Sequence, residues 1–489
     1  MDLNNIKRNQ LDYILTDMLP TELSERFTFF YFYEFLMTKR KELKQMNNFL
    51  ILIKNKYKTG IMFEGGGSGH GGHKGNNWVT MPLKYSIMKE LHTEREISLL
   101  QPIAAGELFA FVSISQKELI NLLDMNSIFS LRHHHKNNEL CYKNKNKSIT
   151  KYFAVESAQI DKDLIEKTGM FFDIKPYKSI ASFTSSEEWL VLNSKYRYFI
   201  RTDYKACFDS IYTHTFKWLI GKDVNDTKDF KNTNIYTTID RILQNINART
   251  SNGIVVGPEF SRMIAEILLQ AIDRTVYSKL LNSGKAVGEN YNVYRFVDDI
   301  FIFAESEELA NEIVQIYSEI SAKYLLRLNE GKLYKNTVPF VLDEWINETS
   351  IFANRTSACL FRTKEEQEIW LQKEKQNSPE KEVVPHILKS RALYYSKRSI
   401  MNQLNELICE YPSKDRTIVA YFLGTILNKV SRNKENVKIF SEHVTEQTVA
   451  NFMDLIFYAY SFFPNYNNTQ RFLSIVSYIR DEYDIFTQK

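Results

Sequence analysis

This sequence contains few of the residues that mark a secreted or membrane protein. Its 489 residues include only four cysteines, too few for a disulfide framework and too dispersed for a paired zinc motif. They are Cys141, Cys207, Cys359 and Cys409. The first residues lack the pattern of a signal peptide, and the apolar run 29–36 is too short and too interrupted to span a bilayer. We therefore expect no membrane association and a cytoplasmic location.

A large excess of charge of one sign is also absent. The chain has 63 Lys and Arg against 59 Asp and Glu, a formal net charge of +4. With so small an excess, binding of nucleic acid depends on local clusters. One cluster is interleaved with Tyr142 and Tyr152, and it consists of Lys136, Lys143, Lys145, Lys147 and Lys151. For this segment we weigh an RNA or DNA contact and a solvated loop equally.

Glycine is scarce except in one segment. Seven of the 17 glycines lie within residues 65–77, a composition that favours a linker over a helix or strand. His70 and His73 of this segment are poorly spaced for a metal site. The other histidine group, residues 133–135 beside Arg132, has no neighbouring Cys or carboxylate. We interpret it as a nucleic-acid contact or a surface loop rather than a metal site.

Two adjacent carboxylates, Asp298 and Asp299, stand between apolar segments that both predict buried strands. The run 294–303 therefore predicts a β-hairpin with these residues at its turn. Acidic residues are depleted from apolar strands and need compensation there. A divalent cation is one such compensation, and hard oxygen ligands suit Mg²⁺. A surface hairpin with a solvated Asp pair is the alternative that this run alone leaves open.

A third carboxylate, Asp203, is predicted at the end of a strand, because the chain before it has strand character and the chain after Phe208 has helical character. Two-metal nucleotidyl transfer needs carboxylates from separate strands around ions roughly 3.5–4 Å apart. Asp203 with Asp298 and Asp299 supplies such a set.

Between these segments, residues 251–270 predict a glycine-bearing loop that leads into a long helix. Gly253 and Gly257 would let the backbone approach a base or phosphate closely, and Pro258 suits a first helical turn. Apolar residues repeat at helical spacing, which we interpret as ordinary core. They are Met263, Ile264, Ile267, Leu268, Ala271, Ile272 and Val276.

In this order, the segments resemble the palm of a reverse transcriptase. Residues 203–208 resemble motif A, residues 253–269 motif B, residues 296–299 motif C with Phe in place of the usual Tyr, and residues 326–332 motif D. The wording of motif B most resembles the bacterial abortive-infection and defence-associated reverse transcriptases, also called unknown groups. The resemblance covers roughly residues 85–340 and rests on several motifs in order.

The resemblance implies roles for individual residues. Asp203, Asp298 and Asp299 would be catalytic and would hold Mg²⁺, for which Mn²⁺ can substitute, and Lys332 would be a general acid toward the leaving pyrophosphate. A solvated lysine is the alternative for Lys332. The nucleotide-binding residues would be Phe208, Gly257, Pro258 and Arg95.

The roles implied for Phe208 and Arg95 can be stated more closely. Phe208 would crowd a ribose 2′-hydroxyl and favour deoxynucleotides, whereas Arg95 can equally be a structural ion-pair residue. Val256 stands where many relatives have Gln, which leaves template handling open.

The fold class that follows is α+β, a reverse-transcriptase-like right hand of fingers and palm with an all-helical C-terminal domain. We predict an N-terminal helical extension with the Gly-rich loop, fingers, palm and a thumb-like helical domain. Their residues are 1–80, 81–200, 201–340 and 341–489. Helical periodicity in the last part covers residues 364–375, 385–395, 399–409, 416–429 and 446–463.

Three functions remain open from the sequence. The first is an RNA-directed DNA polymerase of bacterial antiphage defence, which adds deoxynucleotides to a 3′-hydroxyl on an RNA template or associated noncoding RNA. The second is template-independent, protein-primed synthesis that leaves DNA linked to the chain. The third is a catalytically inactive nucleic-acid-binding scaffold. For priming the family analogy offers five tyrosines, although packing is the stronger interpretation of each: Tyr458, Tyr460, Tyr466, Tyr478 and Tyr483. Relatives also suggest a homo-oligomer.

Overall fold

The computed structural model describes residues 10–20, 28–38, 79–90, 93–125, 127–138, 171–220, 234–340, 344–377, 385–431, 437–441 and 443–483. The predictions for the Gly-rich segment with His70 and His73, and for the lysine cluster beyond Lys136, lie outside these residues. The chain forms two compact units. One comprises residues 1–85, 96–145 and 161–340, and the other comprises residues 86–95, 146–160 and 341–489.

The centre of the first unit is an antiparallel sheet of four strands in the order β6-β7-β5-β8. The strands are β5 (Tyr198–Asp203), β6 (Tyr291–Phe296), β7 (Asp299–Ala304) and β8 (Tyr334–Thr337). The predicted hairpin around the Asp pair is confirmed, because β6 and β7 pair from Tyr291↔Ala304 to Phe296↔Asp299. The predicted strand that ends at Asp203 is β5, and it pairs with the other edge of β7.

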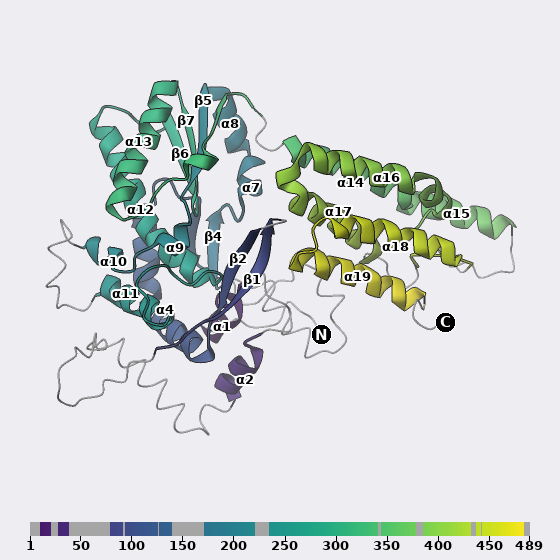
Figure 1. Ribbon diagram of the computed structural model, residues 1–489, viewed down its shortest axis with the longest axis horizontal. Coiled ribbons are helices and arrows are strands. Elements are labelled where there is room, and N and C mark those ends of the chain that lie inside the picture. The colour runs from purple at the N-terminus through teal and green to yellow at the C-terminus, as the bar shows by residue number, and fades with distance from the viewer. Residues whose placement is uncertain are drawn as a thin grey trace. The chain divides into compact units, whose positions relative to one another are not determined.

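Strand β7 is buried on both faces, and isoleucine and phenylalanine alternate along it. Ile300 and Ile302 belong to the main hydrophobic core of this unit, whereas Phe301 and Phe303 face the opposite side, since successive side chains of a strand alternate. The indole of Trp189 covers these two rings at centroid distances of 6.3 and 5.2 Å. Figure 1 shows helices α12 and α13 along one face of the sheet and helices α7 and α8 along the other.

Helix α12 (Glu259–Asn282) begins directly after Pro258, as the sequence predicts. Six of the seven apolar residues predicted for its core stripe are buried, and Ala271 is partly exposed. Helix α13 (Glu307–Lys323) packs beside α12 and begins at Ser306, whose side chain accepts a hydrogen bond from the Leu309 amide.

The other described elements before residue 341 fall into two groups along the sequence. Those before it in sequence are η2 (Gln10–Asp12), α1 (Tyr13–Thr16), α2 (Phe30–Thr38), β1 (Leu83–Glu90), β2 (Thr93–Leu99), α4 (Pro102–Met125), β3 (Arg132–Lys136), β4 (Phe172–Pro176), α7 (Ile180–Thr184) and α8 (Glu187–Lys195). Those within the palm segment are α9 (Cys207–Ser210), α10 (Thr215–Trp218), α11 (Ile235–Asn245) and η4 (Glu330–Lys332). Strands β1 with β2, and β3 with β4, form two separate two-stranded sheets.

Most of the described residues after 343 are helical, as the sequence predicts. The helices are α14 (Glu344–Leu360), α15 (Lys364–Asn377), α16 (Ser390–Glu410), η5 (Pro412–Lys414), α17 (Asp415–Ser431), α18 (Glu446–Ser461) and α19 (Tyr466–Glu482). They share a hydrophobic core of their own. The two helices predicted over 385–395 and 399–409 are wrong in detail: residues 385–389 are not helical, and one helix, α16, runs through the supposed break.

The fold is therefore α+β, a mixed unit around a four-stranded antiparallel sheet and a helical C-terminal region. Within the described residues, no helix combines the length and the apolar character that a membrane span requires.

Candidate active site

The three predicted carboxylates come together at one end of the central sheet. Asp203 is the last residue of β5 and lies directly opposite Asp299, the first residue of β7. Asp298 stands between β6 and β7, in the two-residue turn that it forms with Val297. Two strands that are distant in sequence thus present their acidic residues side by side.

Two of the three carboxylates accept hydrogen bonds from basic side chains. Oδ2 of Asp203 accepts a hydrogen bond from Lys332 Nζ at 2.6 Å. Oδ1 of Asp299 accepts from Arg201 Nε and Nη2 at 3.1 and 2.9 Å. The three carboxylates are neighbours, but their oxygen atoms do not all lie within 4.8 Å of one another.

The electrostatics of the site fit a divalent cation. Burial, reinforced by the charges of Asp299 and Asp203, raises the pKa of Asp298 to about 6. Oδ1 of Asp203 is buried and has no hydrogen-bond partner among the residues that the structure describes, which is costly for a carboxylate oxygen. A cation bound to Asp203, Asp298 and Asp299 would supply the missing partner and remove the repulsion, and hard oxygen donors are what such ions prefer.

A buried arginine fixes the turn that carries Asp298. Arg295 is fully buried, and its guanidinium donates to both carboxylate oxygens of Glu266 at 3.1 and 2.9 Å and to Asp273 at 2.8 Å. Its Nη1 also donates to the carbonyl oxygen of Val297 at 2.8 Å. Val297 has φ of +57°, an unfavourable backbone conformation for a β-branched residue. The arginine therefore ties the strained turn to helix α12.

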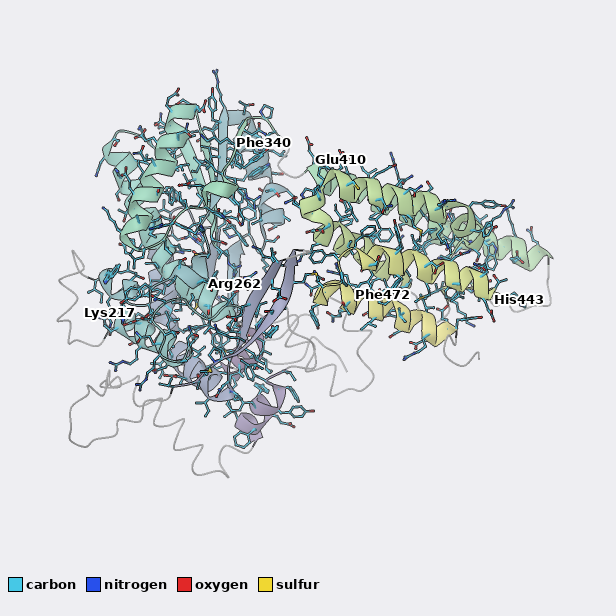
Figure 2. All side chains as sticks on the ribbon, viewed as in Figure 1. Lys217, Arg262, Phe340, Glu410, His443 and Phe472 are labelled. Carbon is cyan, nitrogen blue, oxygen red and sulfur yellow. The ribbon has the colours of Figure 1, made fainter. Side chains whose placement is uncertain are left out.

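A second buried ion pair joins β3 to the start of α12. Glu259 accepts from Arg132, and it also lies 3.2 Å from His134 Nε2 and 3.1 Å from Arg262 Nη1. Burial alone would raise the pKa of Glu259, but these three partners hold it at about 2. Arg262, labelled in Figure 2, lies in the first turn of α12. The Arg132 guanidinium also stands 5.3 Å from the ring centroid of Phe296, the residue that precedes the turn.

The structure shows what the two loop glycines contact within the protein. Gly257 has φ of +128°, and a Cβ on it would lie 2.5 Å from Cγ of Pro20. Gly253 has φ of +78°, and a Cβ on it would lie 3.2 Å from the carbonyl oxygen of Asp209. Both glycines thus permit close approach to protein atoms, and their contact with a nucleotide stays a prediction, as does that of Pro258.

The remaining predicted residues lie as follows. Phe208 is partly buried against the core, and its carbonyl accepts from the Ile254 amide at 2.9 Å, which joins the motif A segment to the motif B loop. Lys332 is on η4 with its ammonium on Asp203, and this hydrogen bond raises the pKa of Lys332. Arg95 is exposed on β2, in the segment grouped with the C-terminal helices, and its role stays a prediction.

Arg295, Glu266 and Asp273 were not singled out from the sequence, although a signal for them exists. Arg295 has the same strand parity as the apolar Tyr291 and Val293, which predicts burial, and a buried arginine requires acidic partners. Glu266 and Asp273 are seven positions apart, and therefore lie on one face of a helix.

Replacement of Arg295 is predicted to be far more costly than replacement of the partly exposed Arg201. Arg295→Met leaves two buried carboxylates without a counter-charge, so we expect a loss of ~3–5 kcal/mol of unfolding free energy. Arg201→Met removes a pair with Asp299 at the rim of the site, and we expect less than ~1 kcal/mol. Urea unfolding of the two variants measures the difference, and equal losses would contradict the assigned role of Arg295.

Asp298→Asn is predicted to stabilise the metal-free protein at neutral pH. Because the folded protein raises the pKa of Asp298 to about 6, the folding stability linked to this group is complete below its ordinary pKa and is lost as pH rises through 6. The variant, which cannot ionise, should exceed the wild type by ~2 kcal/mol at pH 8 with chelator present, and this gain should vanish near pH 4. Thermal unfolding across this range checks the sign. A gain that persists at pH 4 would point to packing instead, and Asp209→Asn is the control on an exposed acid.

Comparison with known proteins agrees with this geometry. Residues 137–351 match the protein family described as reverse transcriptase (RNA-dependent DNA polymerase). No curated protein matches the chain in sequence.

Solved structures of telomerase are also similar to the chain. Telomerase from Candida albicans in complex with a TWJ fragment of telomeric RNA is 10% identical over 84% of this chain and 63% of that one, with a TM-score of 0.31. Apo telomerase from Candida tropicalis is 12% identical over 86% of this chain and 68% of that one, with a TM-score of 0.33. The chain spans less than two thirds of the Candida albicans protein. The family match covers the sheet and the three carboxylates, so the sequence of this part of the chain is similar to that of a reverse transcriptase domain.

Proposed function

We propose that this protein joins deoxynucleotides to a 3′-hydroxyl by two-metal nucleotidyl transfer at Asp203, Asp298 and Asp299. The observation that carries the proposal is the register of the central sheet, which puts Asp203 opposite Asp299 and Asp298 in the adjoining turn. An all-carboxylate set of this kind suits Mg²⁺, with Mn²⁺ as a substitute. When bound, such ions activate the attacking hydroxyl and stabilise the charge of the in-line transition state.

Without a bound metal, basic side chains pair with two of the three carboxylates. Lys332 pairs with Asp203 and Arg201 pairs with Asp299, whereas burial and the charges of these two neighbours raise the pKa of Asp298 to about 6. Asp203 would hold a metal ion in place of the Lys332 ammonium. Displaced from Asp203, Lys332 would retain its proton and could serve the leaving pyrophosphate as a general acid. Its side chain is 61% exposed, which leaves it room to move.

The template and the biological setting complete the proposal. We infer an RNA template or an associated noncoding RNA, and the motif B wording favours a role in bacterial antiphage defence. Protein-primed, template-independent synthesis remains the second candidate from resemblance alone. Two tyrosines considered for priming are engaged: Tyr458 donates to Asn405 at 2.6 Å, and the ring of Tyr460 stacks on Phe472 at 4.6 Å.

Incorporation of labelled nucleotide tests the carboxylates. Purified protein is incubated with each labelled deoxynucleotide and Mg²⁺, with and without an RNA template, and the double variant Asp298→Asn/Asp299→Asn is compared with wild type. Loss of the ligands should reduce incorporation ~100-fold or more. The exposed Asp209→Asn is the matched control and should retain activity.

The outcomes of this assay separate the three functions. Incorporation that requires RNA supports templated synthesis. Incorporation without RNA, into product that stays on the protein after denaturation, supports priming on the chain. A wild-type protein that incorporates nothing under any of these conditions would leave only the inactive scaffold.

Phe208→Ala is predicted to relax the choice of sugar. Removal of the ring would make room for a ribose 2′-hydroxyl, and we expect the ratio of ribonucleotide to deoxynucleotide incorporation to rise ~10-fold or more. Tyr212→Ala is the control, because this nearby ring packs on His214 and Trp218 at 4.9 and 6.0 Å. An unchanged ratio in an active, folded Phe208→Ala protein would exclude the gate.

A further inference from the structure

The structure brings a carboxylate to the histidine group that the sequence analysis left without one. Asp124 lies in the last turn of α4, and His133 and His135 lie two positions apart on β3, on one face of the strand. One ligand atom from each of the three residues lies within 4.8 Å of the other two. The earlier reading of this group as a surface loop is wrong, since residues 132–136 form a paired strand.

We propose that Asp124, His133 and His135 bind a zinc ion that joins the end of α4 to strand β3. Two ligands of a tetrahedral zinc ion lie roughly 3.4 Å apart, given metal–ligand distances of about 2.0–2.2 Å. Nδ1 of His135 and Oδ1 of Asp124 are 4.0 Å apart, too far for a hydrogen bond. All three side chains are partly exposed or exposed, so small rotations can close the set around an ion.

The contacts around His133 orient it as a ligand. Its Nε2 lies 2.6 Å from the carbonyl oxygen of Ser130, so Nε2 carries the hydrogen and Nδ1 keeps its lone pair. A backbone carbonyl that fixes the tautomer in this way is a common partner of metal-binding histidines. The hydroxyl of Ser127 lies 3.0 Å from Nδ1 and 2.8 Å from Nε2. A water molecule can take the fourth position.

The donor types separate this group from the catalytic carboxylates. Two imidazoles and one carboxylate suit zinc, whereas Mg²⁺ prefers oxygen ligands only. The alternative for Asp124 and His135 is a surface ion pair, and side chains that are 44% and 40% exposed would gain little from it.

The position of the group gives the ion a structural role. His134, between the two ligands, points to the opposite face, where it is fully buried and contacts Glu259 at the start of α12. Arg132 on the same strand contacts both Glu259 and the ring of Phe296. An ion on the outer face would therefore fix the strand whose inner face supports α12 and the turn with Asp298.

Zinc titration of the full-length protein tests the proposal. Protein stripped with chelator is titrated with Zn²⁺ against a chromophoric competitor, in excess Mg²⁺ so that the catalytic carboxylates are occupied. We expect one zinc per chain for wild type, and at least ~10-fold weaker binding for His135→Ala and for Asp124→Asn. Co²⁺ in place of Zn²⁺ should give the strong visible absorption of a four-coordinate site, and His135→Ala should lose it.

Two controls keep the result specific. Lys136→Ala alters an exposed neighbour on the same strand and should bind zinc as wild type does. Asp298→Asn/Asp299→Asn should also bind it unchanged, and this readout does not depend on polymerase activity. If His135→Ala and Asp124→Asn bind zinc as tightly as wild type, or if binding is lost in the Asp298→Asn/Asp299→Asn protein instead, the site is not the one proposed. Circular dichroism of each variant excludes loss of fold as the cause.

Discussion

The buried contact of Arg295 with Glu266 and Asp273 is the constraint on which the geometry of the candidate active site depends. An ion costs several kcal/mol to remove from water, and only excellent geometry with further hydrogen bonds offsets that cost. Here the guanidinium meets both carboxylates and the Val297 carbonyl, and Tyr317 donates to the second oxygen of Asp273 at 2.9 Å. Strand β6, helix α12 and the turn are thereby held in a single arrangement. Joint replacement of Arg295, Glu266 and Asp273 by hydrophobic residues could match the stability, but it could not hold a strained backbone carbonyl in place.

The same constraint explains how the sheet tolerates three acidic residues at one end. Arg295 fixes the turn that carries Asp298, while Lys332 and Arg201 neutralise Asp203 and Asp299. Asp298 alone has no such cation as its main partner, and burial next to two carboxylates raises its pKa. The protein thus carries an electrostatic penalty at Asp298 that a divalent cation would relieve. Burial and like charge at a functional site produce this kind of perturbation.

Local patterns predicted the central part of the site, and contacts distant in sequence account for what they missed. The hairpin, the strand end at Asp203 and the start of α12 at Pro258 follow from alternation and helix-capping rules that act within a few residues. The sequence predicts two helices where α16 runs unbroken, because residues 396–399 are polar. Leu393 and Ile400 nevertheless lie on one buried face of α16, and the polar residues cover the other face. The sequence around Gly257 gives no sign that Pro20 occupies the space beside this glycine. His133 and His135 required Asp124, which only the packing of α4 against β3 supplies.

Strand β3 connects these observations, because its two faces have different chemistry. The inner face presents His134 and Arg132 to Glu259, where these residues and Arg262 outweigh the effect of burial and hold the carboxylate ionised with a pKa of about 2. The outer face presents His133 and His135, which no carboxylate of the strand itself can satisfy. Segment 129–131 at the start of the strand also exchanges backbone hydrogen bonds with Arg295, at 2.7 and 2.8 Å. A contact that restrains the outer face of β3 would therefore also restrain the turn with Asp298. Two connections link them, the ion pair of β3 with Glu259 and the backbone hydrogen bonds with Arg295. Loss of order at β3 should consequently weaken the register of the carboxylates even though no residue of β3 is one of them.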